Sequence, residues 1–221
     1  KSLSTQGDMG WRLVRKSKDG ATYPNPVTAD ASRSTKHYVI ASQMITALGH
    51  AGSVLVVAST KLQAQRLAQG IADSIEDAPS LAPLVDLVRN HLGGAHPLVG
   101  TLAKGVGFHH AGLPVEVLEA LEGAVRDDVL PYLTCTSTRT DGVNLPVRTV
   151  VVYDTPYPDQ PEDSRLKGAR LVNAMGRAGR AGRETEGWIV LVRAAEPSEQ
   201  DFTDLNPDAD DLEVTSTLTT D

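Results

Sequence analysis

The sequence predicts an α/β fold, in which a doubly wound and mostly parallel sheet carries helices on both faces. Apolar runs with the length of buried strands alternate along the chain with segments of helical spacing. No hairpin signal joins consecutive strands, and strands separated by helices pair in parallel. The chain has 221 residues and is 40% hydrophobic, so it can bury the core of one domain.

The predicted elements follow one another in a regular order. An amphipathic helix over 34–48 precedes a continuous apolar strand over 53–58, and Ser59 and Thr60 stand where a helix over 61–75 needs its N-cap. Further helices are predicted at 81–92, 114–125 and 165–175, and further strands at 105–109, 130–135, 148–153 and 187–192. This order is that of repeated strand–helix units.

Three segments differ in composition. Residues 1–35 are polar and rich in turn formers, and they are interpreted as a linker or edge segment from a preceding lobe, with a short strand at 11–14. Residues 36–195 hold the alternating elements, and 196–221 form an acidic tail or a linker to a following domain. The chain lacks an initiator methionine, so we expect it to be part of a longer protein.

The formal net charge of −7 is a property of the tail. From residue 196 onward the chain has nine acidic residues and no lysine or arginine, so the rest carries a charge of +2. The body can therefore still meet a polyanion. The single cysteine, Cys135, excludes an internal disulfide and a multi-cysteine metal site. No apolar run is long enough to cross a membrane, and a reducing cytoplasm is the expected setting.

In open parallel sheets, ligands bind beyond the carboxyl ends of the strands, so the segments after each strand are the candidates for chemistry. Thr60 and Lys61 begin a helix, where free backbone N–H groups favour an anion. The alternative is an ordinary cap and a surface lysine. After the next strand come His109 and His110, followed by Ala111 and Gly112. Two histidines are too few for a typical metal site, and the small residues favour a turn that approaches a phosphate.

Two later segments are richer in polar groups. T-S-T-R-T-D-G-V-N-L-P (136–146) combines hydroxyls, an acid and a glycine, which suit phosphate and sugar contacts; the alternative is a solvated turn. G-R-A-G-R-A-G-R (176–183) places glycines around arginines, whose planar forks suit phosphate oxygens. The alternative for this segment is a basic helix end that complements the helix dipole. Its glycine spacing is not that of a dinucleotide-binding fingerprint.

Together and in this order, the four segments resemble the second-lobe motifs of superfamily 2 helicases, most closely those of the Ski-type branch, which includes archaeal DNA-repair helicases and RNA-exosome helicases. Residues 54–61 look like motif IV, and G-F-H-H-A-G-L (107–113) is similar to the segment that follows it. D-G-V-N-L-P (141–146) and G-R-A-G-R (176–180) look like motifs V and VI. The resemblance covers roughly 34–193 and implies a RecA-like lobe.

The resemblance implies a motor in which two RecA-like lobes clamp ATP in their cleft while nucleic acid lies across both. Arg177 and Arg180 would act as arginine fingers on the γ-phosphate. The implied contacts to nucleotide come from Asp141, Gly142, Asn144, Asn173 and Gly176. The implied contacts to the DNA or RNA backbone come from Thr60, Lys61, His110, Gly112 and Thr136.

The sequence departs from the family pattern in two positions and one absence. Asn173 stands where the family commonly has glutamine, which puts sensing of the γ-phosphate in doubt, and Asp141 replaces a common glutamate. No G-x-x-x-x-G-K-[ST] motif occurs, so ATP and Mg²⁺ would be held by an N-terminal lobe in the same or a partner chain. We expect this chain alone not to hydrolyse ATP.

Two other functions compete with the motor. A helicase-like lobe that has lost its ATPase could act as a scaffold or protein-docking module, although intact Arg177 and Arg180 argue against it. A Rossmann-type nucleotide-binding protein would need a glycine fingerprint after its first strand, and none is present.

Overall fold

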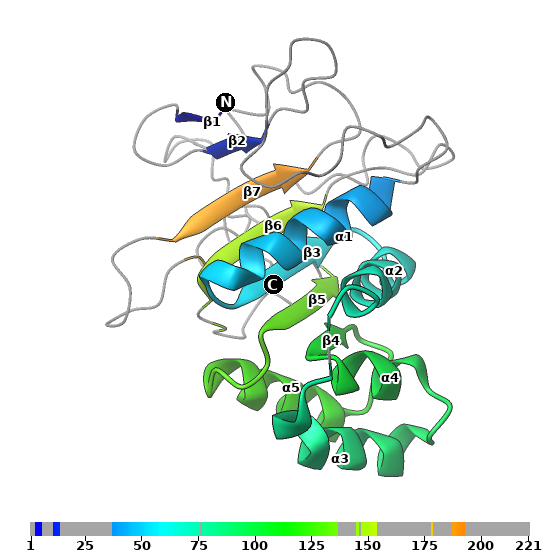
Figure 1. Cartoon of the computed structure of the whole chain (residues 1–221). Helices are drawn as coiled ribbons and strands as arrows, with labels where there is room; N and C mark the ends of the chain where they lie inside the picture. Colours follow the sequence, from blue (N-terminus) through cyan, green and yellow to red (C-terminus); the bar gives the residue numbers. More distant parts are fainter. Residues whose placement is uncertain are drawn as a thin grey trace, which may run out of the picture.

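The computed structural model describes residues 3–5, 11–13, 37–75, 77–136, 145, 147–153, 178 and 187–192. The strands are β1 (Leu3–Thr5), β2 (Trp11–Leu13), β3 (Val54–Ala58), β4 (Val106–His109), β5 (Tyr132–Thr136), β6 (Thr149–Tyr153) and β7 (Trp188–Val192). They form one sheet in the order β1-β2-β7-β6-β3-β5-β4 (Figure 1). The five strands from β7 to β4 are all parallel, and β1 pairs antiparallel with β2 at the edge.

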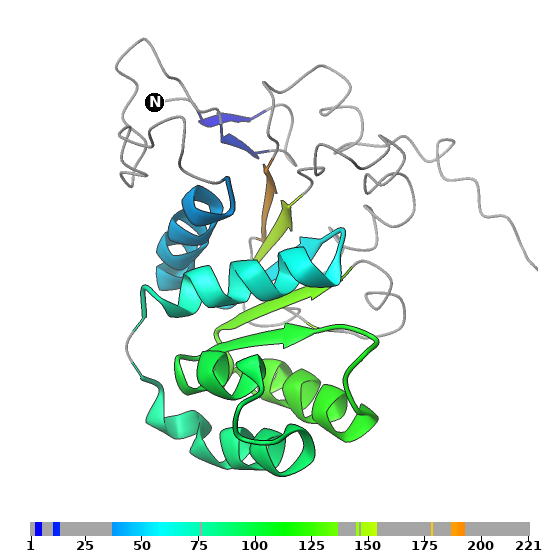
Figure 2. The same ribbon diagram turned by 90° about the vertical axis from the view of Figure 1, so that its right-hand side faces the viewer.

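The helices are α1 (His37–Leu48), α2 (Lys61–Ala72), α3 (Ala82–Leu92), α4 (Pro97–Ala103) and α5 (Val115–Arg126), with 3₁₀ turns η2 (Gly49–Ala51) and η3 (Pro79–Leu81). Helices α1 and α2 pack against each other beside the sheet, and α3 packs on both α4 and α5 (Figures 1 and 2). The helical layer therefore reaches beyond the β4 edge of the sheet.

The two faces of the sheet are covered by different helices. A Cβ atom on Gly107 would lie 3.1 Å from Leu121 of α5, so this face of β4 meets α5. The next residue along the strand points the other way, as the pleat requires. On that second face the hydroxyl of Thr134, which pairs with Phe108, donates to the carbonyl of Ala64 in α2 at 2.8 Å. The doubly wound arrangement predicted from the sequence is confirmed.

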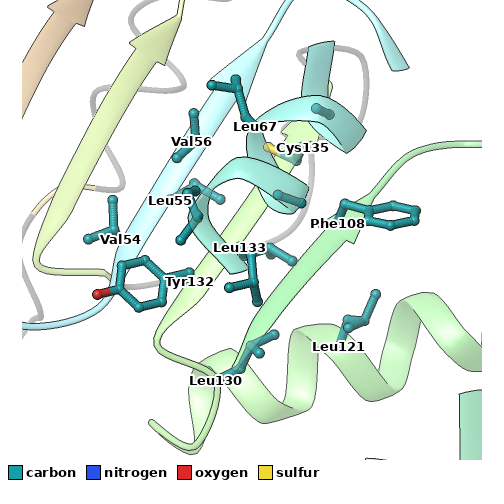
Figure 3. Close-up of a cluster of buried hydrophobic side chains, with 14 of the residues drawn as sticks. Val54, Leu55, Val56, Leu67, Phe108, Leu121, Leu130, Tyr132, Leu133 and Cys135 are labelled. Atoms are coloured by element: carbon teal, nitrogen blue, oxygen red, sulfur yellow. The ribbon is translucent and has the colours of Figure 1, made fainter. Parts of the chain in front are cut away.

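Burial explains why the central strands are continuous apolar runs. Every residue of β3, β4, β5 and β6 is buried, as in strands of a parallel sheet that is covered on both faces. Figure 3 shows part of this core, in which Leu67 of α2 and Leu121 of α5 lie against the strands. The lone cysteine, Cys135, is buried in the same core.

The predicted central strands and helices agree with the structure to within three residues at each end. Helix α4 was not predicted, and neither was the antiparallel pairing of β1 with β2, which the absence of a hairpin signal argued against. The predicted helix over 165–175 and the acidic tail lie outside the described residues. Within the part of the chain that the structure describes, no helix is long and apolar enough to cross a membrane.

Candidate nucleic-acid interface

The carboxyl ends of the central strands meet at one edge of the sheet. Ala58 at the end of β3 pairs with Thr136 at the end of β5, and also with Tyr153 of β6. His109 at the end of β4 pairs with Cys135. The segments that follow β3 and β4 therefore emerge at the same edge of the sheet, on either side of β5, as the sequence predicted.

Thr60 fixes the point at which α2 begins. Its hydroxyl accepts from the backbone N–H of Gln63 at 3.2 Å, and its own N–H donates to the Gln63 side chain at 3.2 Å. This reciprocal capping box satisfies two N–H groups that a helix start otherwise leaves unpaired. Thr60 thus has the capping role given above as the alternative, and it places Lys61, which is exposed, as the first residue of the helix.

Residues 110–113 form a tight turn after β4, here called the histidine loop. The backbone N–H of Gly112 donates to Nδ1 of His110 at 3.1 Å, and the N–H of Leu113 donates to the His110 carbonyl at 3.1 Å. The His110 side chain lies inside the turn, and the residue is only 6% exposed. Ala111 and Gly112 are exposed, so the loop presents backbone rather than the imidazole to solvent.

Lys61 reaches from α2 to the histidine loop. A Cβ atom on Gly112 would lie 3.1 Å from Lys61 Nζ and 3.2 Å from His110 Nδ1. Glycine at this position therefore leaves room for an ammonium group directly over the exposed backbone of the loop. A cation beside accessible backbone of this kind suits a phosphate oxygen.

The surroundings of His110 favour the neutral form of its ring. Burial lowers the pKa of His110 below its ordinary value of 6.5, and the charge of Lys61 lowers it further, followed by smaller effects of His109 and His96. The ring stacks on Phe108, with centroids 5.8 Å apart and planes 19° from parallel. A neutral ring can accept the Gly112 N–H through Nδ1, which a protonated ring cannot.

The two adjacent histidines have separate partners. His109 Nε2 lies 2.9 Å from Glu122 Oε1, which ties the end of β4 to α5. His110 instead contacts α2 and its own loop. Among the described residues, no group of three or more histidine, cysteine or acidic side chains could hold a metal ion.

Of the five residues predicted to contact the DNA or RNA backbone, two are exposed. The other three take part in packing or in helix capping. Lys61 and Gly112 are open to solvent, and Thr60 is half-buried. Thr136 and His110 are each only 6% exposed. The sequence also missed Gln65, whose Nε2 lies 3.2 Å from His110 Nε2. Its spacing of four residues from Lys61 was the available signal, because such residues share a helix face.

The residues predicted to contact nucleotide lie outside the described residues. They are Asp141, Gly142, Asn144, Asn173, Gly176, Arg177 and Arg180. Two described neighbours, Val147 and Ala178, form a parallel β-bridge. The N–H of Thr149 at the start of β6 donates to the carbonyl of Ser53, just before β3, at 3.0 Å. Val147 and Ala178 therefore lie at the amino end of the sheet, opposite to Lys61.

Comparison with known proteins gives helicases as relatives, although no family model matches the chain. It is 32% identical over 159 residues to the ATP-dependent DNA helicase Hel308 of Caldivirga maquilingensis, covering 67% of this chain and 21% of that protein. It is 41% identical over 119 residues to mouse DNA polymerase theta, covering 53% of this chain and 4% of that protein. Human Helicase POLQ-like is 39% identical over 100 residues, covering 45% of this chain and 9% of that protein.

These similarities indicate a relationship to the superfamily 2 helicases. The aligned parts span about a fifth or less of the length of these three relatives. The relationship supports the resemblance found in the motifs, and the parallel sheet flanked by helices is consistent with a RecA-like lobe.

Proposed function

We propose that the chain is the C-terminal motor lobe of an ATP-dependent DNA helicase or translocase of the Ski-type branch. The observation that carries the proposal is the junction of α2 with the histidine loop, where Lys61 Nζ lies over the exposed backbone of Gly112. The relatives named as DNA helicases favour DNA over RNA as the nucleic acid that this lobe binds.

In the proposed grip on the nucleic-acid backbone, the five predicted residues have different roles according to their exposure. The Lys61 ammonium and the backbone around Gly112 contact a phosphate directly. Thr60 holds the start of α2, and His110 holds the loop. Thr136, the last residue of β5, is buried beside them and supports the phosphate-binding site from inside the fold. Contacts of this kind read the strand's charge and not its sequence.

The proposed nucleotide contacts come from the two segments that the bridge between Val147 and Ala178 joins, because Val147 directly follows G-V-N-L-P and Ala178 is the centre of G-R-A-G-R. Arg177 and Arg180 would stabilise the charge that develops on the transferred phosphoryl group. Asp141, Gly142, Asn144, Asn173 and Gly176 would adjoin the nucleotide. ATP and Mg²⁺ would be bound mainly by an N-terminal lobe.

Strand binding tests the first half of the proposal. Lys61→Ala should weaken binding of fluorescein-labelled oligo(dT) at low salt by roughly tenfold, since a charged hydrogen bond contributes about 1.5 kcal/mol. The salt dependence of log K should also fall by about 0.7, the value for one phosphate contact on a single strand. Lys104→Ala is the matched control, because Lys104 precedes β4 at the amino end, where it pairs with Asp77 at 2.7 Å. Equal affinities of the two variants would show that Lys61 does not bind the nucleic acid at this edge of the sheet.

ATP turnover tests the second half. In a protein that includes the ATP-binding lobe, Arg177→Ala and Arg180→Ala should each lower DNA-stimulated ATPase by about 10³-fold, as loss of an arginine finger does. Oligo(dT) binding should be nearly unchanged in both. Turnover that is the same in wild type and both variants would exclude the arginine-finger role.

A further inference from the structure

We propose that Gln65 is a positioning residue, which fixes the His110 ring so that the histidine loop stays against α2 and the Lys61 amine stays over Gly112. The inference rests on the proposed function, because Lys61 is the group proposed there to bind phosphate. Gln65 itself does not contact the nucleic acid.

Two contacts join one face of α2 to the histidine loop. Lys61 and Gln65 are four residues apart on α2 and therefore lie one turn apart on the same face. Lys61 Nζ reaches Gly112, and the side-chain amide of Gln65 reaches Nε2 of His110 at 3.2 Å. The ring of His110 is thus held from the helix on one side and from the Gly112 backbone on the other.

The hydrogen bonds define one tautomer of His110. Nδ1 accepts the Gly112 N–H, so a neutral ring must carry its proton on Nε2. Nε2–H then donates to Gln65, and the acceptor is the carboxamide oxygen, which a half-turn of the amide brings to the ring. Without Gln65, that proton loses its partner on α2, and the orientation with Nδ1 toward Gly112 is less strongly favoured.

The position of the ring controls the position of the loop. His110 is buried and stacks on Phe108, so a rotated ring would need room that the Phe108 face does not give. A Cβ on Gly112 would lie 3.3 Å from His110 Cε1 and 3.1 Å from Lys61 Nζ, which shows that ring, loop and amine are already in close contact. A turn of the ring therefore shifts the backbone over which Lys61 lies.

The variant Gln65→Met tests the positioning role, with Gln69→Met as the matched control. Gln69 is exposed on the same helix and donates to Asp73 at 2.8 Å, away from His110. Long-range ¹H–¹⁵N spectra of the chain report the His110 tautomer, and fluorescein-labelled oligo(dT) reports strand binding. Gln65→Met should reduce the Nε2–H tautomer and weaken binding roughly threefold, the effect of one weakened hydrogen bond. Gln69→Met should change neither.

Gln65→Glu supplies the rescue arm. Its carboxylate still accepts from Nε2, so the Nε2–H tautomer should return, and the added negative charge should raise the pKa of His110. A residue that only fills space would not produce this pair of changes. Gln65→Asn keeps the amide but is one methylene shorter, and it should behave like Gln65→Met, which covers the case that the methionine variant does not fold.

The outcomes separate this inference from the function on which it rests. If Lys61→Ala weakens binding but Gln65→Met matches Gln69→Met in both tautomer and affinity, the positioning role is overturned and the phosphate grip stands. If Lys61→Ala binds as wild type does, the grip falls, and the tautomer spectra still decide whether Gln65 fixes His110.

Discussion

The two ends of the sheet each need a glycine, but the neighbours of the two glycines differ. At the amino end, a Cβ on Gly49 would run into the ring of Tyr132, which is buried and whose hydroxyl donates to the Thr46 carbonyl at 3.0 Å. At the carboxyl end, a Cβ on Gly112 would meet the amine of Lys61, the free end of an exposed side chain. The first glycine serves packing of the core, and the second leaves a surface cation beside open backbone.

Because of this difference, stability should depend mainly on the amino end of the sheet and binding on its carboxyl end. A close contact with a pinned ring can relax only by moving the core, whereas a lysine amine can move a few tenths of an ångström into solvent. Alanine in place of Gly49 should therefore lower stability, whereas alanine in place of Gly112 should mainly weaken binding. Ligands of open parallel sheets bind beyond the carboxyl ends, so the looser end is the one available for function.

Gly49→Ala should have the largest effect of the changes considered. Forcing the Tyr132 ring aside overpacks the amino end and breaks its bond to Thr46, so the free energy of unfolding should fall by about 2–3 kcal/mol. Urea denaturation measures this. The double variant Gly49→Ala/Tyr132→Phe should recover part of the loss, because the hydroxyl oxygen is the nearest atom to the new methyl group. Strictly additive losses would show that the Tyr132 hydroxyl is not what the methyl group meets.

Thr60→Ala should have the next largest effect on stability, although Thr60 lies at the carboxyl end. Loss of the capping box with Gln63 should lower the free energy of unfolding by about 1 kcal/mol. Thr60→Ser keeps the hydroxyl and should lose much less. A variant that keeps its stability but binds oligo(dT) poorly would instead make Thr60 a direct contact to the strand.

Gly112→Ala should change binding more than stability. The new Cβ would lie 3.1–3.3 Å from Lys61 Nζ and the His110 ring, so these groups must shift by only tenths of an ångström. We expect the free energy of unfolding to change by less than about 0.5 kcal/mol, as for surface changes, and the affinity for oligo(dT) to fall roughly threefold. A stability loss like that of Gly49→Ala would erase the contrast between the two ends.

The sequence predicted the central sheet well because its strands are buried on both faces, which makes them continuous apolar runs such as V-L-V-V-A (54–58). Helix α4 was missed because it is short, follows two glycines and contains Gly100. Strand β1 was missed because three residues carry no periodicity.

The candidate site was predictable in its place but not in its exposure. Lys61 and the histidine loop could be found because they follow strands, and parallel strands end at one edge. That His110 and Thr136 are buried while Gly112 is open depends on how α2 packs over β4 and β5, which sequence spacing does not give. The contact of Gln65 with His110, 45 residues apart, depends on the same packing.

The smallest predicted effect is a pH dependence of stability that originates at the carboxyl end. Burial lowers the pKa values of both His110 and His96, with Lys61 adding to the shift at His110. Between each lowered pKa and the ordinary value of 6.5, the unfolded chain binds more protons than the folded chain. The stabilisation is therefore present above about pH 6.5 and is lost as the pH falls toward the folded pKa, with a slope below about 1.4 kcal/mol per pH unit for each histidine.

Urea denaturation at several pH values between about 7.5 and 5.5 measures this slope. His110→Asn removes the titrating ring but keeps a side-chain acceptor near the Gly112 N–H, so its slope should be shallower than that of wild type, and His96→Asn should reduce it separately. His50 is exposed, and His50→Asn is the matched control that should leave the slope as it is. A slope that His110→Asn does not change would mean that the ring is as easily protonated in the folded chain as in the unfolded one. The Gly112 N–H would then not depend on a neutral His110, and the tight turn would have to be held by the Leu113 bond to the His110 carbonyl alone.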